Sequence, residues 1–164
     1  MIAGRSGWHD PALEGSRNQH VEDVVWTGEL ADEQVATLLE GAELAVNASR
    51  YEGFGLAVLE ALAHGVPLVS THVPALSHAA ADAYWRVAAG DVGGFACALG
   101  ALATDPALRA RLAVRGRARG PLLLGRRGAR RARRLSRRAR GRAGTRRVVP
   151  RGSRPGLLGL AHAH

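Results

Sequence analysis

Several residue types are rare or absent in this sequence, and each absence excludes a class of protein. There is no lysine, which excludes a P-loop because that motif binds phosphates through a lysine. A single cysteine, Cys97, excludes an internal disulfide and a cysteine-rich zinc site, and its Ala/Gly/Leu surroundings predict a small buried thiol. No apolar run approaches the roughly 20 residues of a membrane span, and the N-terminus lacks the layout of a signal peptide. We therefore expect a cytoplasmic protein, and peripheral contact with the inner membrane surface stays open.

Charge is divided unevenly along the chain, whose formal net charge is +9. All 14 acidic residues lie between Asp10 and Asp105, and with nine arginines they give residues 1–120 a net charge of −5. Residues 121–164 contain fourteen arginines and no acid. The basic character therefore belongs to the last part of the chain and says little about the preceding domain. The scarcity of lysine, isoleucine and asparagine also suggests a very GC-rich gene.

Short β-type runs alternate with helical patterns along the first part of the chain. Strands are expected at residues 1–3, 24–27, 44–48, 67–71 and 84–88. Helices are expected from residue 32, from about 55 to 64, over 92–103 and over 106–117, the last with Asp105 as N-cap and Pro106 at its first position. This alternation predicts an α/β fold with a doubly wound parallel sheet, in which ligands bind beyond the carboxyl ends of the strands. Residues 121–164 show no sustained period, so disorder is expected there.

The stretch YEGFGLAVLE, residues 51–60, places one carboxylate in a glycine-rich turn and another in the helix that follows. Glycines let the backbone approach a ligand closely, and the free N–H groups of residues 54–57 at the helix start suit a diphosphate. Glu52 before the helix and Glu60 inside it are able to accept hydrogen bonds from hydroxyls on either side of that phosphate. A phosphate between two polyols describes a nucleotide-diphosphate sugar. The spacing alone leaves it equally open that both glutamates are solvated charges on an ordinary loop.

The line ASRYEGFGLAVLEALAHGVPLVST resembles the signature of the retaining, nucleotide-sugar-dependent glycosyltransferases with the GT-B fold, often called group 1 glycosyltransferases. The family pattern is a glutamate, GFG, a second glutamate eight positions after the first, and then A-x-A-x-G-x-P with two apolar residues. The matching residues are Glu52, Gly53, Phe54, Gly55, Glu60, Ala61, Ala63, Gly65, Pro67, Leu68 and Val69. The resemblance covers residues 1–119, and it implies the Rossmann-like C-terminal half of a GT-B fold, which binds the nucleotide sugar.

The resemblance also implies a role for each residue of the motif. Glu52 would contact hydroxyls of the transferred sugar near the reacting centre, and Glu60 would bind the ribose of the nucleotide. Backbone amides at Phe54, Gly55 and Leu56 would hold the diphosphate and stabilise the leaving group, and Gly53 is a further substrate-binding residue. The turn formed by Gly28, Glu29 and Leu30 would line the base pocket. No metal or other cofactor is implied, and His64, His72 and His78 are scattered rather than placed at ligand spacing.

The sequence also departs from the family pattern at both ends. We expect the N-terminal acceptor domain to be absent, so that residues 1–119 alone are inactive or weakly active, with a separately encoded N-terminal domain as one conceivable partner. The basic residues that the family places upstream of the first strand are also missing, and Arg5 is not assigned their role. Residues 120–164 form an Arg/Gly/Ala-rich low-complexity tail, and we hypothesise that they are an out-of-frame reading of the gene.

Two alternatives to a glycosyltransferase remain open at this point. The arginine tail could bind a nucleic acid or an anionic membrane through salt-dependent phosphate contacts. It has no aromatic residue for base stacking and no apolar face for a membrane helix. The chain could instead be a non-catalytic remnant of a glycosyltransferase. For a glycosyltransferase, the expected donor is a UDP-, GDP- or other nucleotide sugar, and the expected acceptor is a glycan, a lipid or a small metabolite.

Overall fold

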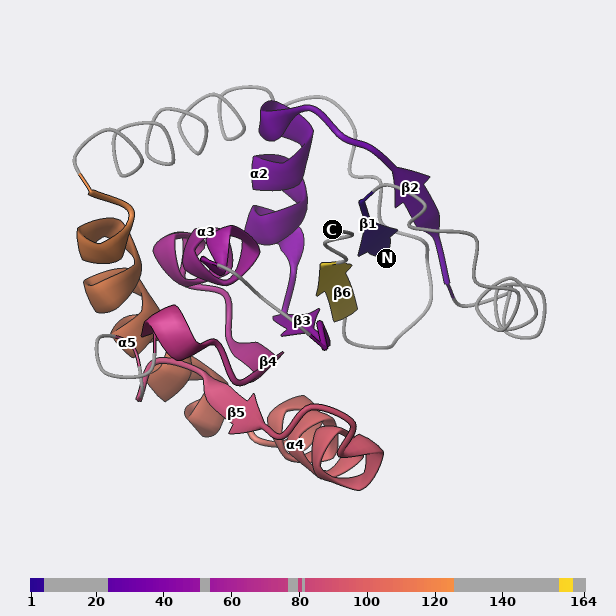
Figure 1. The fold of residues 1–164 in the computed structure, drawn as a ribbon, viewed down its shortest axis with the longest axis vertical. Helices are drawn as coiled ribbons and strands as arrows, with labels where there is room; N and C mark the ends of the chain where they lie inside the picture. Colours follow the sequence, from indigo (N-terminus) through magenta and orange to yellow (C-terminus); the bar gives the residue numbers. More distant parts are fainter. Residues whose placement is uncertain (5–23, 51–53, 77–79, 81, 126–156, 161–164) are drawn as a thin grey trace.

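The chain folds around one six-stranded sheet in the computed structural model, which describes residues 1–4, 24–50, 54–76, 80, 82–125 and 157–160 (Figure 1). The strands are β1 (Ile2–Ala3), β2 (Trp26–Gly28), β3 (Leu44–Asn47), β4 (Leu68–Thr71), β5 (Trp85–Val87) and β6 (Leu157–Leu160). The helices are α2 (Asp32–Gly41), α3 (Leu56–His64), α4 (Val92–Thr104) and α5 (Pro106–Leu123), with a 3-10 turn η1 (Pro74–Leu76). Every strand pair is parallel, in the order β2-β1-β6-β3-β4-β5. The predicted parallel α/β sheet is confirmed.

Apolar side chains cover both faces of the sheet at β3 and β4. Successive residues of a strand point to opposite faces, so Leu68 of β4 packs in one buried cluster with α3, whereas Val69 packs in a second cluster with α4. Strand β3 divides in the same way, with Ala45 in the first cluster and Leu44 in the second. Burial on both faces explains why these strands are short, nearly continuous apolar runs in the sequence.

Helix α3 begins and ends at glycines in the left-handed conformation. Gly55 has a φ of 73° and Gly65 a φ of 69°, a region that side chains with a Cβ rarely adopt. The Gly65 N–H donates to the carbonyl oxygens of Ala61 and Leu62, so it satisfies the end of the helix. A Cβ at Gly55 would lie 2.9 Å from Cγ1 of Val73. The helix predicted from about residue 55 to 64 is confirmed.

Helix α5 begins as its sequence predicts. The Asp105 side chain accepts a hydrogen bond of 2.8 Å from the Leu108 N–H, and Pro106 occupies the first helical position. This arrangement satisfies one of the free amides at the helix start. The guanidinium of Arg109 donates to the carbonyl oxygens of Leu102 and Ala103 at the end of α4. The sharp turn between α4 and α5 is therefore held by hydrogen bonds from both helices.

Two glycines allow α5 to cross α3 at close range. A Cβ at Gly120 would collide with the backbone N of Ala63, and one at Gly116 would lie 3.2 Å from the carbonyl oxygen of Leu62. Both glycines are buried. The helix continues to Leu123, and Leu123 packs against the core cluster around α3. The ordered helix therefore extends four residues beyond the domain boundary expected at residue 119.

Residues 157–160 differ from the disorder expected for the tail. They form β6, which pairs with β1 on one side and with β3 on the other; Figure 1 shows it between these two strands. The sequence Leu-Leu-Gly-Leu is a short apolar run of the kind that forms a buried parallel strand. Four residues are too few to show a sustained period, so this run did not alter the expectation for the tail as a whole. Most of the tail, 126–156 and 161–164, lies outside the described residues.

The prediction that the single cysteine is buried is wrong. Cys97 lies on α4 with an exposed side chain, whereas the next residue, Ala98, is fully buried. The composition around Cys97 indicated a core position, but the helix turns about 100° per residue, so neighbours in sequence face different environments. Only Ala98 and Leu102 of α4 are buried.

Candidate functional site

The predicted donor motif begins at the carboxyl edge of the sheet. Strand β3 ends at Asn47, and α3 begins at Leu56. Because all six strands are parallel, their carboxyl ends lie along one edge, where doubly wound folds bind ligands. The start of α3 therefore lies at the carboxyl edge of the sheet, where the sequence analysis expected a ligand.

The first turn of α3 offers backbone N–H groups that have no acceptor within the helix. The first helical hydrogen bond runs from the Leu59 N–H to the Gly55 oxygen at 2.9 Å, so the amides of Leu56, Ala57 and Val58 precede the hydrogen-bond ladder. Within the described residues, no side chain caps this end and no acid lies in the first turn. Together with the partial positive charge of the helix dipole, these amides favour an anion such as a phosphate.

Glu60 lies on the exposed stripe of α3. Residues 57–59 and 61–62 are buried, whereas Leu56 is half exposed and Glu60 is half-buried. Positions four apart lie on the same face of a helix, so the carboxylate of Glu60 shares its face with Leu56 at the N-terminus. One predicted carboxylate, that of Glu60, therefore lies on the same side of α3 as the predicted anion site, about one helical turn after Leu56.

Phe54 and Leu56 present apolar side chains at the same helix end. Their exposed fractions are 59% and 50%. Surface Phe and Leu side chains that flank a cluster of free amides provide apolar contact area around a polar ligand group. Sequence reasoning assigned these residues a role only through their backbone amides.

The predicted base turn lies at the same edge but on the far strand. Gly28 ends β2 with a φ of 68°, Glu29 is exposed and Leu30 is half-buried. Strands β1 and β6 separate β2 from β3, so three strand spacings, roughly 14 Å, separate Gly28 from the end of β3. The structure places the base turn and the start of α3 on one edge without bringing them into contact. The ligand they share would have to be an extended one.

The carboxylate expected at the reacting centre, Glu52, precedes α3 in the sequence. Glu52 and Gly53 lie outside the described residues, as does Tyr51. Their predicted roles in contacting the transferred sugar and in approaching the diphosphate therefore stay predictions.

A buried polar network fixes the start of this loop, and sequence reasoning missed it. Asn47, at the end of β3, donates through its amide nitrogen to Oγ of Ser70 at 3.3 Å and accepts from Oγ of Ser49 at 3.0 Å. Thr71 donates to the Ser49 carbonyl oxygen at 2.7 Å. Asn47 and Ser70 are fully buried. The signal was present in the sequence, because polar residues end two otherwise apolar strands.

The network has a structural consequence for the site. Buried polar groups are stable only when they are hydrogen-bonded, and a satisfied network specifies one arrangement of its members. Here the Asn47 side chain, bonded to Ser70, and the Ser49 carbonyl oxygen, bonded to Thr71, tie the carboxyl end of β3 to that of β4. Hydrogen bonds therefore hold Asn47 and Ser49, where the chain leaves β3.

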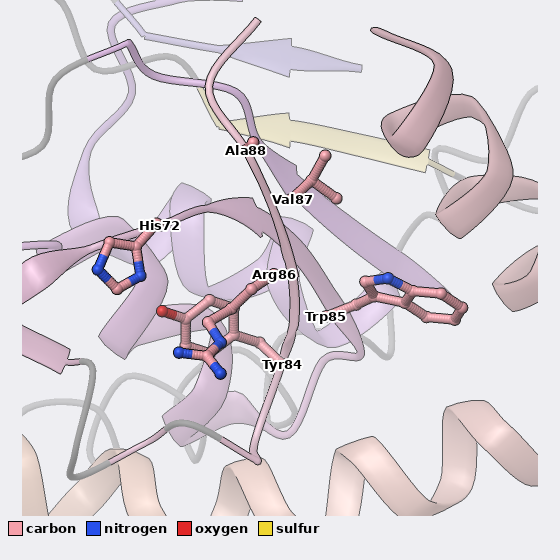
Figure 2. Close-up of a pocket in the computed structure, with 6 residues that line it drawn as sticks. All are labelled: His72, Tyr84, Trp85, Arg86, Val87 and Ala88. Atoms are coloured by element: carbon pink, nitrogen blue, oxygen red, sulfur yellow. The ribbon is translucent and has the colours of Figure 1, made fainter. Parts of the chain in front are cut away.

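A separate cavity of about 530 Å³ opens along β5, lined by His72, Tyr84, Trp85, Arg86, Val87 and Ala88 (Figure 2). None of the predicted site residues lines it. Tyr84 is 3% exposed, and its hydroxyl makes no hydrogen bond of ordinary geometry within the described residues. Burial raises the pKa of Tyr84, and the Val73 backbone amide and the Arg86 guanidinium partly oppose that rise. We assign this cavity no part in donor binding.

Among the described residues, no group of three or more His, Cys, Asp or Glu side chains is placed to hold a metal ion. His64 is half-buried at the end of α3, whereas His72 is exposed beyond the end of β4, and His78 lies outside the described residues. In the part of the chain that the structure describes, no helix is both long and apolar enough to cross a membrane.

Comparison with known families gives a match over more than half of the chain. The model of the family described as "Glycosyl transferases group 1" matches residues 1–105. The match includes the sheet from β1 to β5 and the whole predicted donor motif.

Individual relatives agree with the family match. Over 121 residues the chain is 35% identical to a glycogen synthase of Mycobacterium tuberculosis, covering 72% of this chain and 29% of that protein. Over 103 residues it is 37% identical to an MMP alpha-(1->4)-mannosyltransferase of Mycolicibacterium hassiacum, covering 60% of this chain and 25% of that protein. The chain thus spans less than a third of the length of these curated relatives.

A solved structure shows the same fold. Sucrose-phosphate synthase from Thermosynechococcus elongatus superposes with a TM-score of 0.67 and 24% sequence identity, over 87% of this chain and 38% of that one. The arrangement of parallel strands and helices described above therefore recurs in a protein of clearly different sequence.

Proposed function

Because this chain belongs to the family of group 1 glycosyl transferases, we propose that it binds a nucleotide-diphosphate sugar for retaining transfer of the glycosyl group to an acceptor. The observation that carries the proposal is the exposed face at the start of α3. There, free backbone amides and the Glu60 carboxylate share one side of a helix that begins at the ligand-binding edge of the sheet.

The diphosphate lies on the amides at the start of α3. The amides of Phe54, Gly55 and Leu56 donate to its oxygens, and the left-handed Gly55 lets the backbone turn toward the ligand. Negative charge grows on the diphosphate as the bond to the sugar breaks. Amides and a helix dipole that already point at this charge lower the barrier, because they need no reorganisation during the reaction.

The nucleotide sugar has hydroxyl groups on both sides of its diphosphate, and these bind the two glutamates. Glu60 accepts hydrogen bonds from the two ribose hydroxyls, since a carboxylate is able to accept two O–H groups at once. Glu52 binds hydroxyls of the transferred sugar near the reacting centre. The turn at Gly28, Glu29 and Leu30 contacts the base at the far end of an extended nucleotide. The chemistry assigned to these residues requires no metal or other cofactor.

The acceptor is bound by polypeptide outside the region that matches the relatives. The chain covers 29% of the glycogen synthase and 25% of the mannosyltransferase, so most of each relative has no counterpart here. We propose that a partner domain supplies the acceptor site, either within one longer protein or as a separate chain. Residues 1–164 alone would then bind the donor and transfer it slowly or not at all.

Titration with UDP-glucose and GDP-mannose, followed by calorimetry, tests the proposal. We expect saturable binding of at least one nucleotide sugar, and about 10- to 100-fold weaker binding in Glu60→Gln, because charge-assisted hydrogen bonds are worth about 1.5–3 kcal/mol. Glu40→Gln is the matched control, since Glu40 is an exposed acid on α2 away from the motif. Wild-type affinity in Glu60→Gln would refute the ribose assignment, and no binding of any nucleotide sugar would refute the function.

A further inference from the structure

Strand β5 forms one edge of the sheet, and the cavity of about 530 Å³ described above runs along it. All residues from 84 to 88 line this cavity. Since successive side chains of a strand point to opposite faces, a cavity that touches all of them follows the outer edge of the strand. Within the described residues β5 pairs only with β4, and an edge strand leaves backbone N–H groups without a ladder partner. The cavity therefore has backbone donors on its wall, and its volume lies in the range of small-molecule sites.

Three polar side chains gather on one side of β5. Tyr84 and Arg86 are two positions apart, so they share a face of the strand, and His72 comes directly after the neighbouring strand β4. In the view of Figure 2, the Tyr84 hydroxyl lies between the imidazole of His72 and the guanidinium of Arg86. The Trp85 side chain points to the other side of the strand. A hydroxyl, an imidazole N–H and a guanidinium therefore line the same part of the cavity as hydrogen-bond donors.

The Tyr84 hydroxyl is the group that most clearly indicates a ligand. Tyr84 is 3% exposed, and its hydroxyl makes no hydrogen bond of ordinary geometry within the described residues. The Val73 amide and the Arg86 guanidinium lie near it, but both are donors, so neither is able to accept the hydroxyl proton. A buried polar group without a partner costs free energy, and such groups are rare in folded proteins. An acceptor bound in the cavity would satisfy this proton.

No carboxylate competes for these donors within the described residues. The lining of the cavity contains no acid. The two acids nearest to β5 in the sequence have other partners. Asp82 pairs with Arg119 at 3.7 Å, and Asp91 accepts from the Gly94 amide at 2.8 Å, where α4 begins. Arg86 is exposed and, in the part of the chain that the structure describes, forms no ion pair with a carboxylate. Its positive charge is therefore available to a ligand.

The chemistry of these donors defines the ligand as an anion. A guanidinium binds carboxylates and phosphates alike through two parallel N–H groups. A carboxylate presents its two oxygens in one plane, whereas a phosphate group presents three acceptor oxygens in different directions. Donors that come from separate side chains around a cavity are matched better by the phosphate.

We propose that the cavity along β5 binds the phosphate group of a small molecule. The Arg86 guanidinium binds two oxygens of this phosphate, the Tyr84 hydroxyl donates its proton to the third, and the His72 imidazole donates from the side of β4. Arg86 and His72 are both exposed, so their side chains are able to rearrange as the phosphate reaches the buried hydroxyl. The rest of the molecule occupies the remaining volume along the edge of the strand.

This phosphate site lies apart from the predicted diphosphate site at the start of α3. None of the predicted donor residues lines the cavity. The two places are nevertheless close, because Val73 contacts both of them. Its amide lies near the Tyr84 hydroxyl, and a Cβ at Gly55 would lie 2.9 Å from its Cγ1. The phosphate-bearing molecule would therefore be a second ligand beside the nucleotide sugar, and its binding does not depend on the function proposed above.

Titration of the full chain with inorganic phosphate, followed by NMR, tests the site. The backbone amides of Val87 and Ala88 line the cavity and serve as reporters, because the arginine-rich tail would also bind phosphate in a bulk measurement. We expect saturable shifts of both amides, no such shifts with chloride at equal ionic strength, and about tenfold weaker binding of acetate, as for the loss of one hydrogen bond. Absence of a saturable phosphate shift would overturn the site. Acetate that binds as tightly as phosphate would overturn the choice of phosphate.

Two substitutions test the side chains that hold the phosphate. Arg86→Gln should weaken its binding about 10- to 100-fold, because charge-assisted hydrogen bonds are lost. Tyr84→Phe should weaken it about tenfold and leave the fold intact, since the hydroxyl has no partner among the described residues to lose. Arg111→Gln is the matched control, because Arg111 is exposed on α5 and does not line the cavity. Wild-type phosphate affinity in Arg86→Gln or in Tyr84→Phe would overturn the site as assigned.

Nucleotide-sugar binding separates this site from the donor site. The affinity for the nucleotide sugar that the wild-type chain binds should be unchanged in Arg86→Gln, and phosphate should shift Val87 and Ala88 equally in Glu60→Gln. If Arg86→Gln lost nucleotide-sugar binding, the cavity would belong to the donor site and a second ligand would be excluded. A wild-type chain that binds phosphate at these amides but no nucleotide sugar would refute only the proposed function.

Discussion

The buried Tyr84 hydroxyl makes the stability of the protein depend on alkaline pH. Burial raises the pKa of Tyr84 above the ordinary value of 10.0. A group whose pKa is higher in the folded state stabilises the fold fully below its unfolded pKa and loses that contribution as the pH rises. The free energy of unfolding should therefore fall as the pH rises above about 10.

Replacing Tyr84 with phenylalanine should remove this alkaline dependence. The hydroxyl makes no hydrogen bond of ordinary geometry within the described residues, so its loss at pH 8 should be neutral or stabilising by up to about 1 kcal/mol. Urea unfolding at pH 8 and pH 11 measures both effects. A variant Tyr84→Phe that loses stability as steeply as wild type above pH 10 would contradict this account.

The glycine at the start of α3 is required for two separate reasons. An alanine at Gly55 would adopt a left-handed φ of 73°, which costs about 1–2 kcal/mol, and its Cβ would lie 2.9 Å from Val73 and 3.2 Å from Leu76. Gly90 is the matched control, because its φ is 84° but nothing lies within 4 Å of a Cβ there.

We expect both alanine variants to lose the backbone contribution, and Gly55→Ala to lose about 1–3 kcal/mol more through overpacking. Gly55→Ala should also weaken nucleotide-sugar binding, because the amides of the anion site move with the helix start. Denaturant unfolding and calorimetric titration measure the two effects. Equal destabilisation of Gly55→Ala and Gly90→Ala would show that the contact with Val73 is unimportant.

At the scale of elements, the crossing of α3 and α5 depends on small residues. Alanine normally stabilises a helix over glycine by about 1 kcal/mol, but a Cβ at Gly120 would collide with the backbone N of Ala63. Gly120→Ala should therefore destabilise the protein by about 1–3 kcal/mol, since two backbones must separate. Gly100→Ala on α4, where nothing lies within 4 Å of a Cβ, should be stabilising. Thermal unfolding of the two variants tests both expectations. Unfolding midpoints that shift in the same direction in Gly120→Ala and Gly100→Ala would refute them.

The end of α3 and the start of α5 show which local signals are sufficient to predict a helix boundary. Gly65 and Asp105 act through their own backbone or side chain on residues no more than four positions away, so the sequence predicted both helix ends. The continuation of α5 to Leu123 was not predictable in this way. It depends on the packing of Gly116, Gly120 and Leu123 against α3, a contact between segments that are far apart in sequence.

At the scale of the whole molecule, the basic tail and the donor site should respond differently to salt. The fourteen arginines of residues 121–164 would bind a polyanion such as heparin with an affinity that falls steeply with salt concentration. Deletion of the tail would also remove β6, so replacement of these arginines with glutamine is the cleaner change. We expect the variant to lose heparin binding and to keep nucleotide-sugar binding. Loss of both activities in calorimetric titrations would favour a tail-dependent function.

The sequence shows the proposed donor motif more completely than it shows the geometry of the proposed site. Glu60 and the glycines around Phe54 follow a contiguous pattern, and the structure places the described part of that pattern at the start of α3. The network of Asn47, Ser49 and Ser70 escaped prediction, because its members come from two strands whose adjacency is a property of the sheet. A polar residue at the end of an apolar strand is the signal that would have found it.

The sequence by itself determined the parallel α/β class, the helix that follows Gly55 and the membership in the group 1 glycosyl transferases, because periodicity, capping and a contiguous motif are local properties. Tertiary structure alone decided the strand order, the exposure of Cys97 and the insertion of β6 between β1 and β3. These depend on which faces are buried against segments distant in the chain. The free energy of burial and of ladder hydrogen bonds, rather than any local preference, selects among those pairings.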